Sequence, residues 1–150
     1  MGAMDGSASA DIDAPLAAVW AVVEDVASAP QWQGGMDTMD VREHDAQGRA
    51  ELCETATDVG PRTVRSTVRF EYEPEHRLTW TQVKGDLKNV VGSWELDDLG
   101  DGRTRATYSL KGDPGRILGM LTRGPVADKV RAVIVDRRPG ELKERVEGPA

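Results

Sequence analysis

Turn residues recur about every ten positions between Met36 and Leu110, and this spacing limits the possible folds more than any other feature. Between the turns, apolar and polar residues alternate with a period of two, which is typical of strands with one buried face. Each turn supplies Gly, Pro or Asp where the backbone must reverse: DAQGR, DVGP, EPEH, GDLK and DLGDGR. We therefore predict six antiparallel strands, over residues 36–44, 49–57, 62–72, 77–84, 90–97 and 104–110.

Helical spacing flanks these strands on both sides. After a short strand expected at 7–12, Asp13 is placed to cap a helix that has Pro15 in its first turn. Apolar residues then follow at spacings of three and four: Leu16, Val19, Trp20, Val23 and Val26. Pro30 should end this helix near 28–30 and let a second short helix carry Trp32.

The C-terminal segment from Asp113 onward returns to helical spacing. Two dipeptides interrupt it, Gly124-Pro125 and Pro139-Gly140, and each should kink or break the helix because proline lacks a backbone N–H. We interpret residues 117–123 either as a gate that the first interruption releases or as one arm of a plain bend. The chain as a whole is predicted to be α+β, with a curved antiparallel sheet of about seven strands and a long, kinked C-terminal helix.

Length and charge narrow the class of protein. A chain of 150 residues suits a single domain over 1–150, large enough for a core with a cavity, with residues 1–6 as a disordered start or remnant and 147–150 as a tail. The net charge is −7 and no Lys/Arg cluster stands apart, which argues against nucleic-acid binding. No apolar run approaches the roughly 18 residues that stable membrane insertion requires. Cys53 is the only cysteine, which excludes an intramolecular disulfide and favours a cytoplasmic location.

Two stretches carry a family resemblance. IDAPLAAVWAVVEDVASAPQW resembles the opening of the polyketide cyclase/dehydrase and coenzyme Q-binding branch of the START-like (SRPBCC) superfamily, through Ala14, Pro15, Val19, Trp20, Asp25, Pro30 and Trp32. VKGDLKNVVGSWELDDLGDGRTRATYSL is similar to a later motif of the same branch, through Gly85, Gly92, Trp94 and Leu96. The resemblance covers nearly the whole chain and implies the helix-grip fold, in which the sheet wraps around the C-terminal helix. The two interruptions depart from the continuous helix that is usual there.

Strand alternation predicts which side chains face a cavity between sheet and helix. The expected lining is apolar with a few polar groups: Ser66, Val68, Phe70, Trp80, Gln82, Gly92, Trp94, Tyr108, Leu118 and Leu121. Gly92, beside Ala106 and Ser66, should leave empty volume in the wall, with a bulge or bend as the alternative. A second alternative places Gln82 and Tyr108 at a wet rim. Trp20 and Trp32 are expected mainly to pack the joint between the two short helices.

Side chains capable of chemistry are few. His44 and His76 fall at hairpin turns, Cys53 has no base nearby, and Asp97, Asp98 and Asp101 do not match a calcium loop, so we expect no metal site. The candidates for acid–base catalysis are Glu54 and Tyr108. In RAELCETAT the inward set is either Leu52, Glu54 and Ala56 or Cys53, Thr55 and Thr57, and the second is favoured. An inward Glu54 would have a raised pKa suited to proton transfer.

These observations predict binding of a hydrophobic small molecule, such as a lipid, a quinone or a polyketide-like ring system. The resemblance leaves two alternatives open: a polyketide aromatase/cyclase or dehydrase that uses the same cavity, and a ribosome-association factor like the toxin branch. We expect no cofactor. The expected partners are the hydrophobic ligand and, as an open alternative, a second copy of the chain in a homodimer.

Overall fold

The computed structural model describes residues 5–60, 62–119 and 123–148. Its strands are β1 (Gly6–Ile12), β2 (Met36–His44), β3 (Ala50–Asp58), β4 (Thr63–Glu73), β5 (Arg77–Gly85), β6 (Asn89–Gly100) and β7 (Arg103–Asp113). Its helical elements are α1 (Leu16–Glu24), the 3₁₀ helix η1 (Val26–Gln31), α2 (Gly115–Leu118), α3 (Gly124–Arg131), the π-helical turn η3 (Ala132–Asp136) and α4 (Arg138–Glu147). The predicted α+β class and the order of elements are confirmed.

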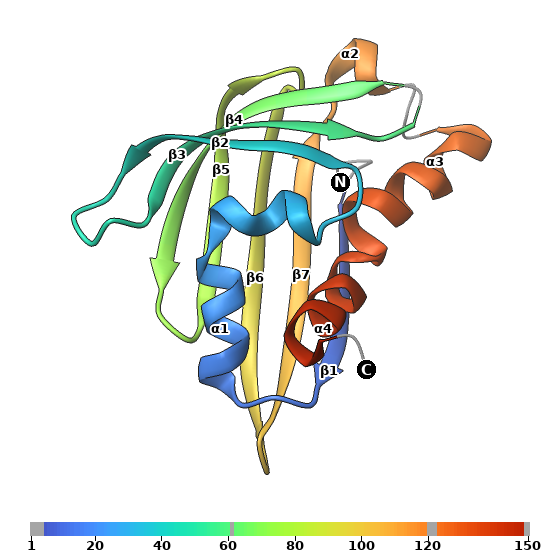
Figure 1. The fold of residues 1–150 in the computed structure, drawn as a ribbon. Helices are drawn as coiled ribbons and strands as arrows, with labels where there is room; N and C mark the ends of the chain where they lie inside the picture. Colours follow the sequence, from blue (N-terminus) through green and yellow to red (C-terminus); the bar gives the residue numbers. More distant parts are fainter. Residues whose placement is uncertain (1–4, 61, 120–122, 149–150) are drawn as a thin grey trace.

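The strands form one antiparallel sheet in the order β1-β7-β6-β5-β4-β3-β2, within the described residues. Consecutive strands from β2 to β7 are hairpin neighbours, and β1 closes the far edge by pairing with β7. The sheet curves around the helices, and α1 and α4 lie side by side across β6 and β7 (Figure 1). This is the helix-grip fold, with helices against the concave face of a meander.

The β6–β7 hairpin is longer than the sequence pattern predicted. Pairing runs from Asn89 opposite Asp113 to Gly100 opposite Arg103, with an irregularity at Leu99, so only Asp101 and Gly102 connect the two strands. Asp101 and Gly102 both have positive φ, at 55° and 72°, which is the geometry of the tight turns that match the twist of a hairpin. Polar residues on each side of the turn can remain in strand because this end of the hairpin is exposed.

The N-terminus of α1 differs from the expectation. Asp13 does not cap the helix; its carboxylate accepts a hydrogen bond from Arg103 Nε at 3.0 Å instead. The helix starts after Pro15, which has extended backbone, and no side chain caps it. Pro30 lies inside η1, and Trp32 is the residue at its end, so the second short helix is the 3₁₀ helix.

The C-terminal helical segment changes geometry at both predicted interruptions. Gly124 has φ +67° and opens α3, with Pro125 in the first turn. Before Pro139, the helix widens into η3, where the N–H of Arg137 bonds to the carbonyl of Ala132 five residues back, at 3.0 Å. A π-turn is one of the recognised ways to bend a helix. The gate hypothesis for 117–123 depends on residues 120–122, which lie outside the described residues.

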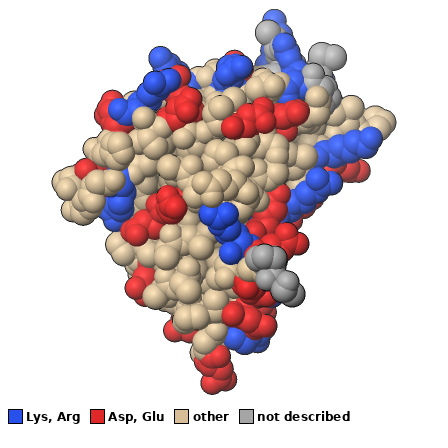
Figure 2. Space-filling view, viewed as in Figure 1, with Lys and Arg blue, Asp and Glu red and all other residues tan. Residues whose placement is uncertain are grey.

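In the view of Figure 2, Lys/Arg and Asp/Glu side chains are mixed around the outline of the molecule and also lie across its middle, between larger uncharged areas. Over the part of the chain that the structure describes, no helix combines the length and apolarity needed to cross a bilayer.

Candidate functional site

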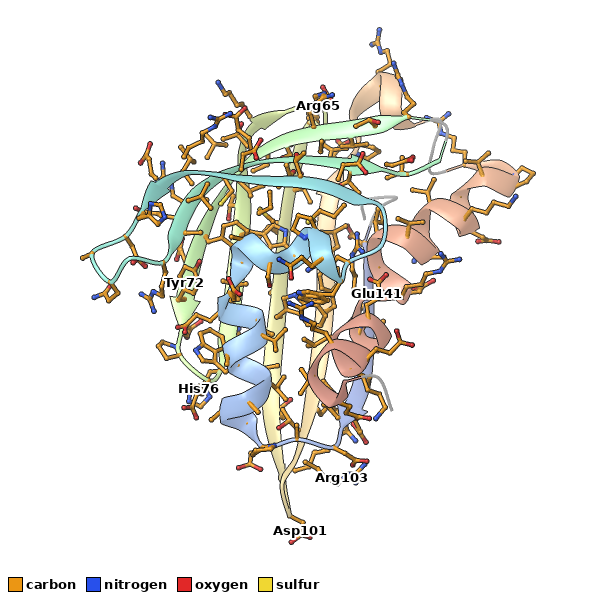
Figure 3. All side chains as sticks on the ribbon, in the orientation of Figure 1. Arg65, Tyr72, His76, Asp101, Arg103 and Glu141 are labelled. Carbon is orange, nitrogen blue, oxygen red and sulfur yellow. The ribbon has the colours of Figure 1, made fainter. Side chains whose placement is uncertain are left out.

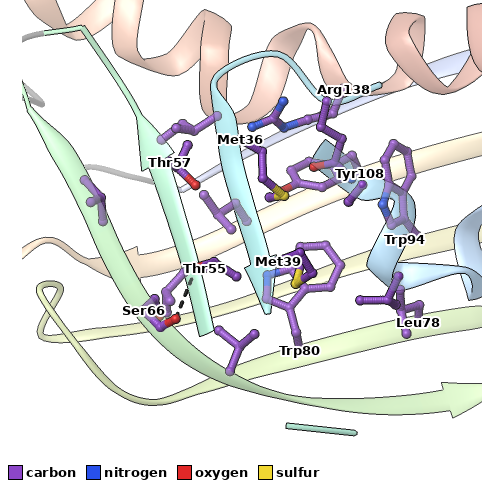
Figure 4. A pocket seen from close by; sticks show the side chains of 18 of the residues that line it. Met36, Met39, Thr55, Thr57, Ser66, Leu78, Trp80, Trp94, Tyr108 and Arg138 are labelled. Atoms are coloured by element: carbon purple, nitrogen blue, oxygen red, sulfur yellow. Dashed lines mark hydrogen bonds between the residues drawn. The ribbon is translucent and has the colours of Figure 1, made fainter. Parts of the chain in front are cut away.

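A cavity of about 150 Å³ lies between the concave face of the sheet and the helical segments (Figure 4). The sheet supplies the floor through inward residues of β3 to β7, including Thr55, Thr57, Val64, Ser66, Val68, Phe70, Leu78, Trp80, Val90, Trp94, Tyr108 and Leu110. Helices and their connections supply the cover, including Val23, Val26, Ala29, Trp32, Gln33, Val130, Ile134 and Arg138, and β2 adds Met36. The lining is thus apolar apart from a few hydroxyl, amide and guanidinium groups and the carboxylate of Asp25.

The structure brings most of the predicted lining residues together. Strand alternation places these six against the cavity: Ser66, Val68, Phe70, Trp80, Trp94 and Tyr108. Leu121 lies outside the described residues, and Leu118 is described only by its place in α2. Gln82 and Gly92 do not border the cavity, for different reasons.

Gly92 leaves no empty volume, which corrects the expectation. A Cβ atom at this position would overlap the indole ring of Trp80, its register partner on β5. The missing side chain of Gly92 therefore lets Trp80 lie flat across β6. Trp80 covers this part of the wall, and Trp80 rather than Gly92 lines the cavity.

Gln82 is occupied by internal hydrogen bonds. Its amide oxygen accepts from the Ser66 hydroxyl at 2.8 Å, and its amide nitrogen donates to the Leu87 carbonyl at 2.9 Å. The Gln82 side chain therefore supports the β5–β6 turn and orients Ser66. It is neither a cavity-lining residue nor a side chain that is free in solvent at the rim. On the neighbouring strand, the Thr55 hydroxyl donates to the Ser66 carbonyl at 3.2 Å (Figure 4).

An aromatic cluster forms the centre of the floor. Trp94 and Tyr108 pack edge to face with ring centroids 4.7 Å apart, and Trp80 lies 5.4 Å from Tyr108. Phe70 extends the cluster from Trp80 at 6.0 Å, and Trp32 of the cover reaches Trp94 at 6.2 Å. Trp32 thus lines the cavity as well as packing the joint, whereas Trp20 donates to Glu24 away from it.

Tyr108 is buried rather than at a wet rim. Burial raises the pKa of its phenol, while the positive charge of the neighbouring Arg138 guanidinium lowers the pKa in part. The net shift is upward, so at neutral pH the hydroxyl keeps its proton. Tyr108 can donate a hydrogen bond inside the cavity but cannot serve there as a base.

Arg138 is the residue that sequence reasoning missed. Its side chain is nearly fully buried, with 2% of the residue exposed, and it borders the cavity beside Tyr108 and Met36 (Figure 4). The signal was present in its spacing of four and eight from Ile134 and Val130, both lining residues. We did not predict Arg138 as a lining residue because arginine is charged and is rarely buried without a partner.

Glu141 is that partner. Its carboxylate accepts from Arg138 Nη1 at 3.0 Å and from the Gly34 backbone N–H at 2.8 Å. Arg138 Nη1 also donates to the Gly34 carbonyl at 2.8 Å. Together these bonds fasten α4 to the connection between η1 and β2, and they hold the helical cover against the sheet.

Glu54 faces away from the cavity. It is exposed and pairs with Arg42 on the neighbouring strand, so the inward set on β3 is the one with Thr55 and Thr57. The structure therefore removes the geometric basis for Glu54 as an acid–base group inside the cavity. His76 and Asp101 lie at the far ends of hairpins, well separated from Glu141 (Figure 3).

The donor set for a metal centre is missing from the described part of the chain. Among the described residues, no group of three or more His, Cys, Asp and Glu side chains could hold a metal ion.

Cys53 is fully buried on β3, outside the cavity lining. Burial, with a smaller contribution from Asp40, raises the pKa of its thiol to about 11. At pH 8 the thiolate fraction should be about 100-fold below that of an unshifted thiol. We expect 5,5′-dithiobis(2-nitrobenzoate) to label Cys53 at least about 100-fold more slowly in the native protein than in urea, followed by absorbance at pH 8. Equal rates in the two states would show that the thiol is accessible.

Comparison with known proteins identifies the family. The model of the polyketide cyclase/dehydrase and lipid transport family matches residues 4–147. The chain belongs to this family. The family's description joins polyketide chemistry to lipid transport, and these activities have a hydrophobic ligand in common. No curated protein matches the sequence.

Solved structures share the family's fold. A START superfamily protein from Mycobacterium smegmatis has a TM-score of 0.80 at 17% identity, covering 95% of this chain and 97% of its own. A protein from Thermus thermophilus has a TM-score of 0.81 at 20% identity, with the same coverage of 95% and 97%. An aromatase/cyclase from Streptomyces sp. R1128 has a TM-score of 0.71 at 17% identity, covering 95% and 93%. At these identities the similarity establishes the helix-grip fold alone.

Proposed function

We propose that this protein binds a hydrophobic small molecule in the cavity between its sheet and its C-terminal helical segment. The observation that carries the proposal is the cavity itself: it is bordered by aromatic and aliphatic side chains from both layers of the fold. A cavity of about 150 Å³ can enclose one small ring or a short acyl segment. Ligand classes that meet this description include lipids, quinones and polyketide-derived rings.

The family membership supports this proposal and keeps polyketide cyclisation as the alternative. A cyclase needs groups that transfer protons within the cavity. The described lining contains no histidine, cysteine or glutamate, and its one carboxylic acid, Asp25, is an exposed residue. Tyr108 and Arg138 can polarise a ligand oxygen, but neither is a base at neutral pH. Binding without turnover is therefore the better-supported function.

Native mass spectrometry of the purified protein, followed by solvent extraction, would identify the class of a co-purifying ligand. A direct test uses α-methylstyrene, an apolar single-ring probe, titrated while the indole N–H signals are followed by NMR. Three tryptophans, Trp32, Trp80 and Trp94, line the cavity and should shift with one binding curve. Trp20 lies outside the lining and serves as the internal control. A shift of Trp20 alone, or of none of the four, would contradict the proposal.

A variant that fills part of the cavity from the sheet side tests the same proposal. Val64 borders the cavity and is half-buried, so Val64→Phe should lower the affinity for α-methylstyrene by at least about fivefold, because the added ring occupies ligand volume. Val83→Phe is the matched control: this exposed side chain lies on the opposite face of β5, and its replacement should leave the affinity within about twofold. Equal affinities for the two variants would exclude this cavity as the binding site.

A further inference from the structure

Arg138 uses only part of its hydrogen-bonding capacity to hold the fold together. Both bonds that join it to Gly34 and Glu141 come from Nη1, at 2.8 and 3.0 Å. Its Nε–H is buried and has no acceptor among the described residues. A buried donor on a charged group is costly when it is left unpaired. The attachment of α4 does not require this donor, so a different partner must account for it.

Arg138, which carries this unpaired donor, borders the cavity, and the Tyr108 side chain lies beside it (Figure 4). The Tyr108 hydroxyl stays protonated because burial raises its pKa. Two donors, a guanidinium N–H and a phenol O–H, therefore stand next to each other at the end of the cavity nearest α4. Such a pair matches one oxygen atom with two lone pairs.

The charge balance indicates what kind of oxygen fits. Glu141 is mostly buried and already pairs with Arg138, so the cavity end as a whole is close to neutral. A carboxylate or phosphate would lose its hydration and meet Glu141 as well as Arg138. A carbonyl oxygen carries no full charge, so it loses much less hydration free energy than an anion when it leaves water.

We propose that Arg138 Nε and the Tyr108 hydroxyl form a two-donor site for the carbonyl oxygen of a neutral hydrophobic ligand, such as an aromatic ketone or a quinone. The site rests on the proposed function, because it names the class of ligand that the cavity takes. In this proposal Arg138 has two roles: Nη1 holds the helical cover in place, and Nε donates a hydrogen bond to the ligand.

The test compares three single-ring probes of nearly equal shape on the wild-type protein. Acetophenone has a carbonyl where α-methylstyrene has a methylene group, and benzoate has a carboxylate. By NMR titration, acetophenone should bind at least about fivefold tighter than α-methylstyrene, because it satisfies the two donors. Benzoate should bind more weakly than acetophenone, because Glu141 opposes its charge.

Variants then assign the preference to the two donors. Tyr108→Phe keeps the ring and should reduce the acetophenone/α-methylstyrene affinity ratio at least about twofold. Arg138→Met with Glu141→Gln removes both charges together and should also reduce the ratio at least about twofold, to the preference that the Tyr108 hydroxyl alone provides. The matched control is Arg103→Met with Asp13→Asn, an exposed pair at 3.0 Å, which should leave the ratio unchanged. Glu141→Gln alone should shift the preference toward benzoate.

The acetophenone/α-methylstyrene affinity ratio distinguishes a hydrogen bond to the ligand from a purely structural role of Arg138. If Arg138 acts only in packing, both probes lose affinity in parallel and the ratio stays constant, which overturns the proposal. Equal wild-type affinities for acetophenone and α-methylstyrene would overturn it too while leaving apolar binding intact. Tighter binding of benzoate than of acetophenone would overturn the neutral-ligand assignment. If none of the probes binds, the proposed function fails and the two-donor site fails with it.

Discussion

Replacing Trp94 with alanine is expected to lower the free energy of unfolding by about 3 to 5 kcal/mol. Trp94 is 2% exposed and lies at the centre of the aromatic cluster, in contact with Trp32 of the cover and Tyr108 of the floor. Removing its ring extends an existing cavity, and a rigid sheet cannot collapse to refill that space. Urea denaturation followed by far-ultraviolet circular dichroism measures the change.

Val91→Ala supplies the control for this prediction. Val91 lies on the same strand but is 39% exposed, so its truncation should change the free energy of unfolding by no more than about 0.5 kcal/mol. A loss below about 1 kcal/mol in Trp94→Ala would mean that the two layers do not pack through this ring.

Gly92→Ala is expected to destabilise the protein by about 1 to 3 kcal/mol, although it adds only one methyl group. The new Cβ would overlap the Trp80 indole, so this ring must move away from β6. Trp80 borders the cavity, and its displacement should also weaken α-methylstyrene binding. Chemical denaturation and the NMR titration described above measure the two effects on one sample.

A second glycine provides the matched control. An added Cβ at Gly140 in α4 meets nothing within 4 Å, so Gly140→Ala should be neutral or stabilise the helix by up to about 1 kcal/mol. A double-mutant cycle tests the cause: Trp80→Leu should cost less in the Gly92→Ala background than in the wild type. Additive effects would show that Gly92 and Trp80 do not depend on each other.

Local pattern in the sequence was sufficient for the architecture. Alternation along VRSTVRF and the turns on either side of it predicted the inward positions of Val64, Ser66, Val68 and Phe70, because side chains on a strand must alternate between faces. Proline chemistry predicted both changes of geometry in the C-terminal segment, since a missing N–H acts on the backbone locally. These features depend on residues that are close together in the chain, so the sequence alone determines them.

Contacts between distant segments were decided only in the tertiary structure. Gly92 was predicted to leave a void. Whether the space beside a glycine is empty depends on the side chain of its cross-strand partner, and here the Trp80 indole fills that space. Asp13 was predicted to cap a helix, but Arg103 lies close enough in the fold to take its carboxylate.

Arg138 shows the same limit most clearly. Glu141 lies only three positions further along the same helix, so the pair by itself suggests an exposed ion pair. The contact that only the fold supplies is the one between Arg138 and the backbone carbonyl of Gly34, 104 positions away in the chain. Hydrophobic periodicity is determined locally and can be read from the sequence. Burial of a polar group depends on partners supplied by other elements, which is why the polar end of this cavity emerged only once the chain was folded.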